Sequence, residues 1–374
     1  MITTVTDVLS LLVAFSVIVL IRRSRNGGGL TGLAHRARLA RRRRLRFDPA
    51  AYGLPPLEQL DARRAGPPPP VYRSKEIQAI AHAAWEGDWR PAAAYVEAAG
   101  RDWDERWSRM ELLQQVMEQD DSWLDAWLLV QPDSCEAATL HAQRLLHQAW
   151  AIRGSEYANK VPADRMAAFR RLVPASIDAA KQAAELGPQD PGPWVVMVTA
   201  ARGAQYSHEQ FRPLWEGLVA RAPHHYTGHW QAMQYWCAKW FGSNRLMLEF
   251  AERTVGRAPA GSPLAGIYVH ALYELVKRSG SAALPSSAAA KDLLVQAARS
   301  LDQVPEGDER LPRLRHLLAH YLNKAGRYEA ALEQFRLLGP WCGAEPWTKE
   351  VDPVAAFDFA RGTAATKAGT TAGR

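Results

Sequence analysis

The chain has 374 residues, of which 47% are hydrophobic and 14 are tryptophan, so it is long enough and apolar enough to bury a substantial core. Its three cysteines, Cys135, Cys237 and Cys342, lie far apart, which argues against a disulfide framework or a Cys-x-x-Cys zinc site and is typical of reduced core thiols. The formal net charge of +7 comes from residues 1–47, where ten arginines accompany one aspartate, while the remainder has 36 basic against 38 acidic residues. A nearly neutral body argues against a nucleic-acid partner.

Residues 2–21 form an apolar stretch in which Asp7 is the only charge. As a helix this stretch would span roughly 30 Å, the thickness of a bilayer core. We therefore expect a transmembrane anchor at residues 1–22, because a cleavable signal peptide needs a basic start and a small-residue cleavage site, and neither is present. The arginines that follow predict a single-pass protein of the cell membrane with its body on the cytoplasmic side.

Residues 23–71 have the composition of a tether, with a flexible Asn26–Gly29 segment, an arginine-rich stretch and four consecutive prolines at Pro67–Pro70. Two interpretations remain open. The arginines either lie along an anionic membrane surface or serve only to set the topology. The candidates for lipid contact are Arg22, Arg23, Arg41, Arg42, Arg43 and Arg44.

Residues 72–356 are predicted to be helical, with about fourteen helices in seven hairpins between 74 and 338. The clearest hairpin is Leu318–Leu338, where apolar residues recur at steps of three and four on both sides of a turn at Ala325–Tyr328. A break at Gly154–Pro162 precedes a long predicted helix, Ala163–Glu185. After Pro340 two tryptophans among turn residues predict a cap over the last hairpin, and residues 357–374 are expected to be a disordered tail.

The hairpin Leu318–Leu338 resembles a tetratricopeptide (TPR) repeat, with Gly326 in the turn, Tyr328 at the start of the second helix, Ala331 as the small contact residue and Phe335 as the aromatic one. It departs from the family in having Arg315 and Leu338 where tryptophan and alanine are usual. Prolines at 188, 223 and 259 resemble joins between repeats, at a spacing slightly longer than the family's period of about 34 residues. The chain also resembles uncharacterised bacterial membrane-anchored TPR-like proteins. The resemblance implies an all-α fold, a right-handed α-solenoid of antiparallel hairpins.

The resemblance further implies that the first helix of each hairpin lines a groove for a peptide. The candidate groove residues are Arg202, Gln231, Tyr235, His316, His320 and Asn323, which hold repeat positions, and Lys239, which lies beside the repeat position Ala238. The alternative is that these are ordinary polar positions on amphipathic helices. Tryptophan pairs four residues apart, such as Trp236 and Trp240, are expected to pack between helices rather than to form a ligand site.

No catalytic motif is present: His208-Glu209 is not followed by the second histidine of a zinc protease. The pairs His225/His229 and His316/His320 have helical spacing but no third ligand, so we expect no metal and no cofactor.

The sequence thus predicts a non-enzymatic scaffold that binds an unknown protein or peptide partner beside the membrane. Two alternatives stay open: a sensor that uses the arginine-rich arm to recognise anionic lipid or the envelope, and an enzyme whose pocket is assembled from several repeats. Loose candidates for that pocket are Arg153, Asp164, Arg165 and His208.

Overall fold

The computed structural model describes residues 47–154, 160–280 and 284–371. The chain divides into two compact units, Met1–Asp48 and Pro49–Arg374, and the second contains all the features described below. The expected anchor and the six candidate lipid-contact arginines lie outside the described residues. Within the described ranges, no helix combines the length and the apolar character needed to cross a membrane.

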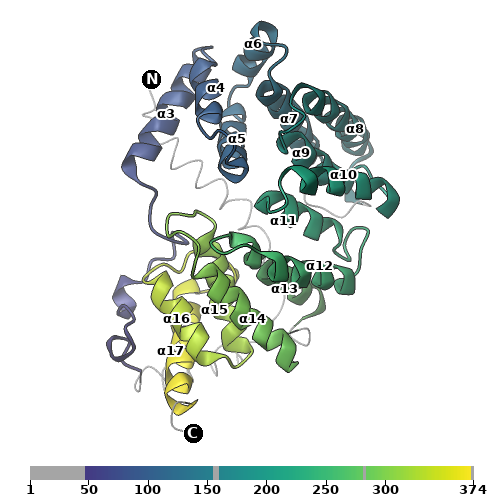
Figure 1. Cartoon of the computed structure of the whole chain (residues 1–374). Coiled ribbons are helices and arrows are strands. Elements are labelled where there is room, and N and C mark those ends of the chain that lie inside the picture. Colours follow the sequence, from purple (N-terminus) through teal and green to yellow (C-terminus); the bar gives the residue numbers. More distant parts are fainter. Residues whose placement is uncertain (1–46, 155–159, 281–283, 372–374) are drawn as a thin grey trace. The chain divides into compact units, whose positions relative to one another are not determined.

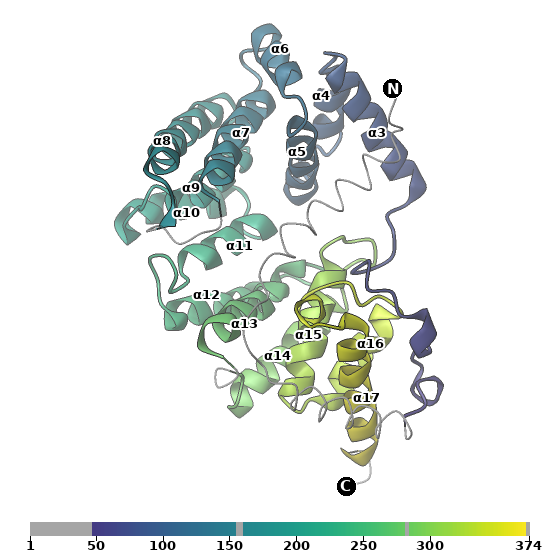
Figure 2. The same cartoon turned by 180° about the vertical axis from the view of Figure 1, so that it is seen from behind.

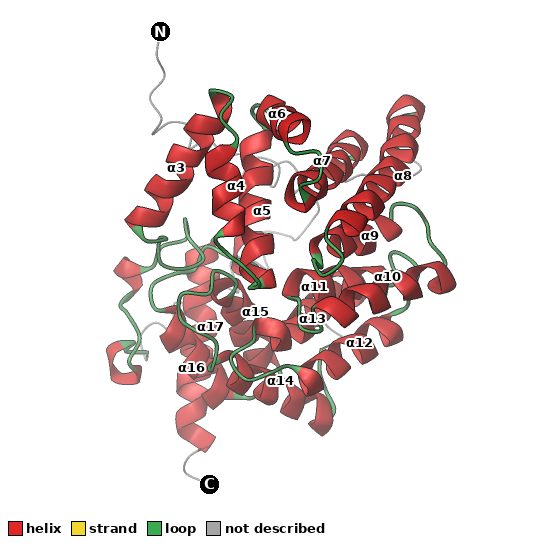
Figure 3. Cartoon of the chain, turned by 45° about the horizontal axis from the view of Figure 1, so that its top comes forward, coloured by secondary structure: helices red, strands yellow, loops and turns green. Residues whose placement is uncertain are grey.

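All regular secondary structure in the described part of the chain is helical, which confirms the all-α prediction (Figure 3). The fifteen α-helices are α3 (Val71–Trp85), α4 (Arg90–Glu97), α5 (Trp103–Met117), α6 (Ser122–Val130), α7 (Cys135–Arg153), α8 (Ala163–Leu186), α9 (Gly192–Ala201), α10 (His208–Arg221), α11 (Tyr226–Tyr235), α12 (Asn244–Arg257), α13 (Gly266–Ser279), α14 (Ala288–Leu301), α15 (Leu311–Lys324), α16 (Tyr328–Leu338) and α17 (Pro353–Thr371). Short 3₁₀ turns lie at Ala50–Tyr52, Leu57–Gln59, Pro263–Ala265 and Trp347–Lys349.

The fourteen helices from α3 to α16 match the predicted number and pack mainly on their neighbours in sequence (Figures 1 and 2). The most extensive contacts are those of α7 with α8, α15 with α16, and α8 with α9. In addition, each odd-numbered helix contacts the next odd-numbered one, from α3 through to α17. In the same way, α12 contacts α14, and α14 contacts α16. The odd-numbered helices therefore form one continuous row.

The hairpin of α15 and α16 has the local features that its sequence predicts. Gly326 adopts φ +77° in the turn, a conformation that glycine accepts without strain. Ala331 and Phe335 are fully buried, whereas Glu333 between them is exposed. Helix α8 also forms as expected, from Ala163 to Leu186.

Residues 49–66 do not form the free tether that their composition predicts, because they pack against the C-terminal helices (Figure 2). Asp61 donates its backbone N–H to Pro340 O (2.8 Å), and Cys342 donates to Asp61 O (2.9 Å). Gly343 donates to Arg64 O at 2.7 Å, and a Cβ at Gly343 would lie only 2.5 Å from Arg64 N. The close approach of the two backbones therefore requires glycine at this position.

The predicted disordered tail is instead largely helix α17, and only residues 372–374 lie outside the described chain. Phe357, Ala364 and Ala365 are buried, and α17 packs on α15 and α16. Small side chains allow close helix packing without the broad apolar stripe by which sequence patterns identify a helix. Arg361, also buried, donates to Asp358 (2.8 Å) and to Pro55 O (2.6 Å), so it holds α17 to residues 49–66.

Candidate functional site

The candidate groove residues of the last hairpin are occupied by the chain itself. His316 is fully buried, with Nε2 2.9 Å from Ala65 O and with Nδ1 accepting a hydrogen bond from Trp347 Nε1 (2.9 Å). Asn323 donates to Ala360 O in α17 (2.9 Å), and the His320 ring packs on Trp347. Trp347 thereby caps this hairpin, as the sequence predicts. These three residues were predicted to contact a bound peptide. In the structure they contact the chain's own terminal segments instead.

Two candidates of the middle hairpins also have partners within the fold. Tyr235 is buried, stacks on Phe211 with ring centroids 3.8 Å apart, and donates to Tyr206 O (2.8 Å). Its position is therefore structural rather than accessible to a partner. Lys239 is exposed and forms an ion pair with Glu274 of α13, with 2.9 Å between Nζ and Oε2.

Arg202 and Gln231, by contrast, are brought together in a half-buried aromatic cluster. Arg202 follows the end of α9 and donates to Gln231 Oε1 of α11 (2.6 Å). Its guanidinium carbon lies 5.5 Å from the ring centroid of Trp150 and 5.9 Å from that of Trp240. These distances are in the range of cation–π interactions, which become stronger where water is excluded. We refer to Arg202, Gln231, Trp150 and Trp240, together with Arg153, as the Arg202 cluster.

Within residues 47–154, 160–280 and 284–371, no adjacent carboxylate neutralises the positive charge of the Arg202 cluster. Burial lowers the pKa of Arg202 to about 10, and the charge of Glu274 opposes this effect only in part. Glu274 is already paired with Lys239, and among the described residues no carboxylate lies within ion-pair distance of Arg202. Arg153 lies 5.5 Å from the same Trp150 ring and donates to Gly154 O, a neutral acceptor. Two guanidinium groups thus share one indole.

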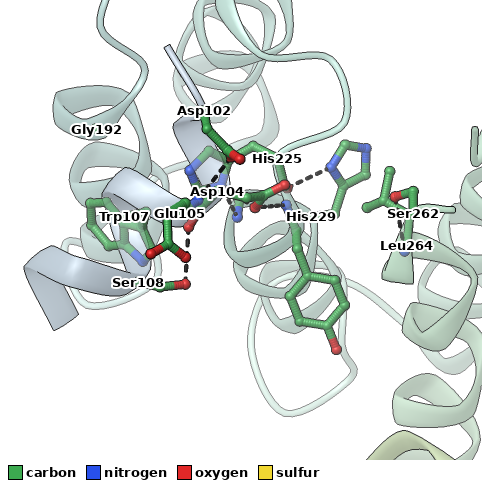
Figure 4. A network of polar contacts seen from close by, with 12 residues as sticks. Asp102, Asp104, Glu105, Trp107, Ser108, Gly192, His225, His229, Ser262 and Leu264 are labelled. Atoms are coloured by element: carbon green, nitrogen blue, oxygen red, sulfur yellow. Dashed lines mark hydrogen bonds and ion pairs between the residues drawn. The ribbon is translucent and has the colours of Figure 1, made fainter. Parts of the chain in front are cut away.

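A second polar network, around Asp104 of α5, provides a contrast because its guanidinium, Arg310, has carboxylate partners (Figure 4). Asp104 Oδ1 accepts from the backbone N–H of Tyr226 in α11 (2.9 Å) and lies 3.5 Å from an Arg310 nitrogen. Arg310 also donates twice to Asp308, at 2.8 and 2.7 Å. His225 packs edge-on against Trp107, and burial lowers its pKa. This network fastens α5 to α11 and has a structural function.

A groove of about 440 Å³ lies between α14 and α16 and is lined by both polar and apolar groups. Gln334 is buried there, donates to Asp302 (3.1 Å) and leaves its Oε1 without a partner. Arg327 at its edge forms an ion pair with Asp292. Basic and acidic side chains are mixed in the lining, so its charge does not select one class of ligand.

The remaining predicted residues do not assemble into a reactive site. In the described part of the chain, no three His, Cys, Asp or Glu residues are grouped so that they could hold a metal ion. Arg165 donates to Ile152 O (2.5 Å), whereas His208 is bonded to Phe241 O (2.7 Å) on a different hairpin. Cys135, Cys237 and Cys342 are all free and buried.

Sequence reasoning identified Arg202 and Gln231 but not the aromatic residues around them. Trp240 was expected only to pack between helices, and Trp150 was not singled out. The available signal was Trp150 and Arg153, which are three residues apart and therefore lie on one face of α7. No family model matches the chain, and no curated protein matches it.

Proposed function

We propose that the chain is a TPR-like protein-interaction scaffold, anchored in the membrane by residues 1–22 with its body on the cytoplasmic side. In this proposal the seven hairpins stack as an α-solenoid, and the row of odd-numbered helices presents the binding face. The regular contacts of each odd-numbered helix with the next support the stacking. The turn at Gly326 and the buried Ala331 and Phe335 support the TPR-like character.

The observation that carries the binding role is Arg202, whose charge is held between two indoles with no carboxylate partner among the described residues. Removing a charge from water is unfavourable unless it is compensated, so a fold that needed only stability would gain by an apolar residue here. The partner is therefore proposed to contact α9 and α11 at Arg202 and Gln231, with Lys239 at the edge. No catalytic step is part of the proposal.

Site-specific photo-crosslinking in membranes tests the scaffold. A photoreactive amino acid replaces the exposed Ala238, beside Lys239, and as a control the exposed Glu252 on α12. We expect a discrete crosslinked protein from position 238 and none from position 252, with the yield at 238 reduced by Arg202→Met. Equal products from both positions, or a yield independent of Arg202, would contradict the proposed binding face.

The membrane topology is tested separately. A reporter enzyme that is active only outside the cytoplasm is fused after Arg374, and a second fusion places it before residue 1. We expect activity from the second fusion only. Activity from the C-terminal fusion would show that the body is not cytoplasmic.

A further inference from the structure

We infer that residues 67–72 bind in an aromatic-lined groove of a partner protein. The inference goes beyond the proposed function, because it concerns a different part of the chain from Arg202 and Gln231 and a different kind of recognition. We refer to residues 67–72, whose sequence is Pro-Pro-Pro-Pro-Val-Tyr, as the proline segment.

The backbone of the proline segment is fixed by its own sequence. Proline holds its φ at about −65° and confines the residue before it to extended conformations. Pro67, Pro68 and Pro69 each precede another proline, so all three are confined to the polyproline II conformation. Pro70 has φ −55° and ψ 139°, close to the values of about −75° and +145° for this helix. With three residues per turn, Pro67 and Pro70 face the same side, and this Pro-x-x-Pro spacing is the pattern that aromatic-lined grooves recognise.

The proline segment is held at both ends by the folded unit. On one side, Ala65 O lies 2.9 Å from His316 Nε2, and a Cβ at Gly66 would come within 2.6 Å of a side chain of α15. On the other side, Arg73 forms an ion pair with Glu309 at 3.1 Å. The conformation that a groove would bind therefore exists before binding, which reduces the entropy lost when the complex forms.

The proline segment presents an apolar surface to solvent. All four prolines are exposed, and Val71 and Tyr72, the first two residues of α3, are 71% and 73% exposed. None of the six residues is charged. A segment that only connected two parts of the fold would not need exposed apolar side chains after its prolines, whereas contiguous exposed apolar groups mark interaction sites.

A protein groove fits this surface better than a lipid bilayer does. The polyproline II helix has no internal hydrogen bonds, so its carbonyl groups need donors. Lipid tails offer no donors, whereas side chains of a protein groove can supply them. Charge gives a further criterion. Arg63 and Arg64 precede the segment and are exposed, and Asp61, 2.8 Å from Arg63, is the only acidic residue between positions 61 and 72. The groove is therefore expected to carry an acidic residue beside Arg64.

Leu129 and Val130 at the end of α6 provide a contrast. They are 84% and 63% exposed, and they are likewise consecutive apolar residues. They follow a helix instead of a run of prolines, so they lack the polyproline II backbone. Leu129 therefore serves as a matched control for Tyr72.

The test uses the full-length chain in a neutral detergent and a purified WW domain as the probe, because the aromatic-lined groove of this domain binds polyproline II segments. The probe carries 5-fluorotryptophan in its groove, so its fluorine signal reports binding without interference from the 14 tryptophans of the chain. A second version of the probe has the groove tyrosine replaced by alanine. We expect a saturable change of the fluorine signal with the intact probe and none with the altered one.

Variants of the chain show whether binding depends on the proline segment. Pro67→Ala combined with Pro70→Ala should weaken binding by about tenfold or more, as should Tyr72→Ala, because a few central residues carry most of the energy of an interface. Arg64→Gln should weaken it less. Leu129→Ala should leave it unchanged. Tyr72→Ala should melt at the temperature of the parent, since its side chain is exposed, so its loss of binding would not reflect unfolding.

Four results would overturn the inference: no signal change with the intact probe, an equal change with the altered probe, unaltered binding by Tyr72→Ala, or an equal loss of binding by Leu129→Ala. Binding of residues 49–374 to vesicles of neutral lipid that is lost in Tyr72→Ala would assign the segment to a membrane surface and would also overturn it. The scaffold proposal can fail independently, because its crosslink from position 238 requires Arg202 and not Tyr72.

Discussion

His316 makes a pattern of hydrogen bonds that only a neutral imidazole can make. Its Nε2–H donates to Ala65 O, so Nδ1 must be unprotonated to accept from Trp347 Nε1–H. Protonation would place two donors against each other in a fully buried site. Burial accordingly lowers the pKa of His316 to about 4.

This arrangement predicts a loss of stability in acid. The unfolded chain takes up a proton at His316 near pH 6.5, and the folded chain does so only near pH 4. The contribution of neutral His316 to the free energy of unfolding is therefore complete above pH 6.5 and is lost as the pH falls toward 4. The shift corresponds to at most about 3 kcal/mol. Urea unfolding of residues 49–374 is measured for the parent and for His316→Gln, which keeps one donor and one acceptor but does not titrate.

We expect the stability advantage of the parent over His316→Gln to shrink between pH 7 and pH 4. His229, His270 and His320 also have pKa values lowered by burial to about 4, and they titrate equally in both proteins. The difference between the two proteins therefore isolates position 316. Parallel stability curves over this range would show that His316 does not couple protonation to folding.

Ala331 tests the packing of the last hairpin at the scale of one side chain. It is fully buried in α16, which packs against α15 and α17. Ala331→Trp should overpack this interface and cost on the order of 1–3 kcal/mol or more. Glu329→Ala, two residues away and exposed, should change stability by less than about 0.5 kcal/mol. Similar thermal midpoints for the two variants would contradict the register of α16.

At the scale of elements, the differences from the sequence prediction concern the two ends of the folded unit. Residues 49–66 were predicted as part of the tether 23–71, yet their backbone hydrogen bonds to residues 340–343 hold them in place. Helix α17 lacks an apolar stripe and is held by small residues and by Arg361. Each end depends on the other for its packing. Sequence patterns are judged over short stretches, so they cannot show that residues 49–66 and α17 pack on each other.

Removal of residues 49–66 should therefore destabilise the C-terminal helices specifically. Six hydrogen bonds to residues 316–361 would be lost, each worth roughly 1 kcal/mol, so the fragment 67–374 should be less stable than 49–374 by on the order of 3–6 kcal/mol. Cys342 reports on the contact between residues 49–66 and the C-terminal helices. Burial raises the pKa of its thiol to about 11 and so protects the thiol from labelling reagents.

Thiol labelling followed by peptide mass spectrometry gives the measurement. In fragment 67–374 we expect Cys342 to react rapidly, while Cys135 and Cys237 stay protected as internal controls. Equal protection of Cys342 in both fragments would show that residues 49–66 contribute little to the C-terminal packing.

At the scale of the whole molecule, local patterns predicted the number of helices and the hairpin turns, because glycine turns and apolar periodicity are properties of short segments. They did not predict contacts such as that of Asp104 with Tyr226, which are separated by 122 residues. The same holds for the site. Arg202 and Gln231 were found from repeat positions, but the charge imbalance appears only once Trp150, Trp240 and Glu274 are placed around them.

The arginine-rich arm yields a prediction about the membrane surface. Each basic residue near an anionic leaflet contributes about 1 kcal/mol of attraction, which salt screens. Fragment 23–374 should bind vesicles of anionic lipid at low salt and dissociate as salt is raised, whereas 49–374 should not bind. This control keeps residues 49–66 and thus the folded unit. Equal binding by both fragments, or by neither, would leave the arm as a topology signal only.

In the proposed membrane topology, the docking of residues 49–66 also changes which segment would set the distance of the body from the bilayer. Pro67–Pro70 were expected to act as a spacer between membrane and body. They instead connect two parts of the folded unit, the docked segment and α3. Residues 49–70 therefore belong to the folded unit and are not available as a spacer.

The same docking has a consequence for synthesis on the ribosome. Pro55 is translated early, but its partner Arg361 follows 306 residues later. At about 5–20 residues per second, residues 49–66 wait roughly 15–60 s for the surface that covers them, while α3 and its successors can already pair with their neighbours. Docking of residues 49–66 on the C-terminal helices is therefore the last step in folding of this unit. In any chain that terminates early, residues 49–66 stay uncovered.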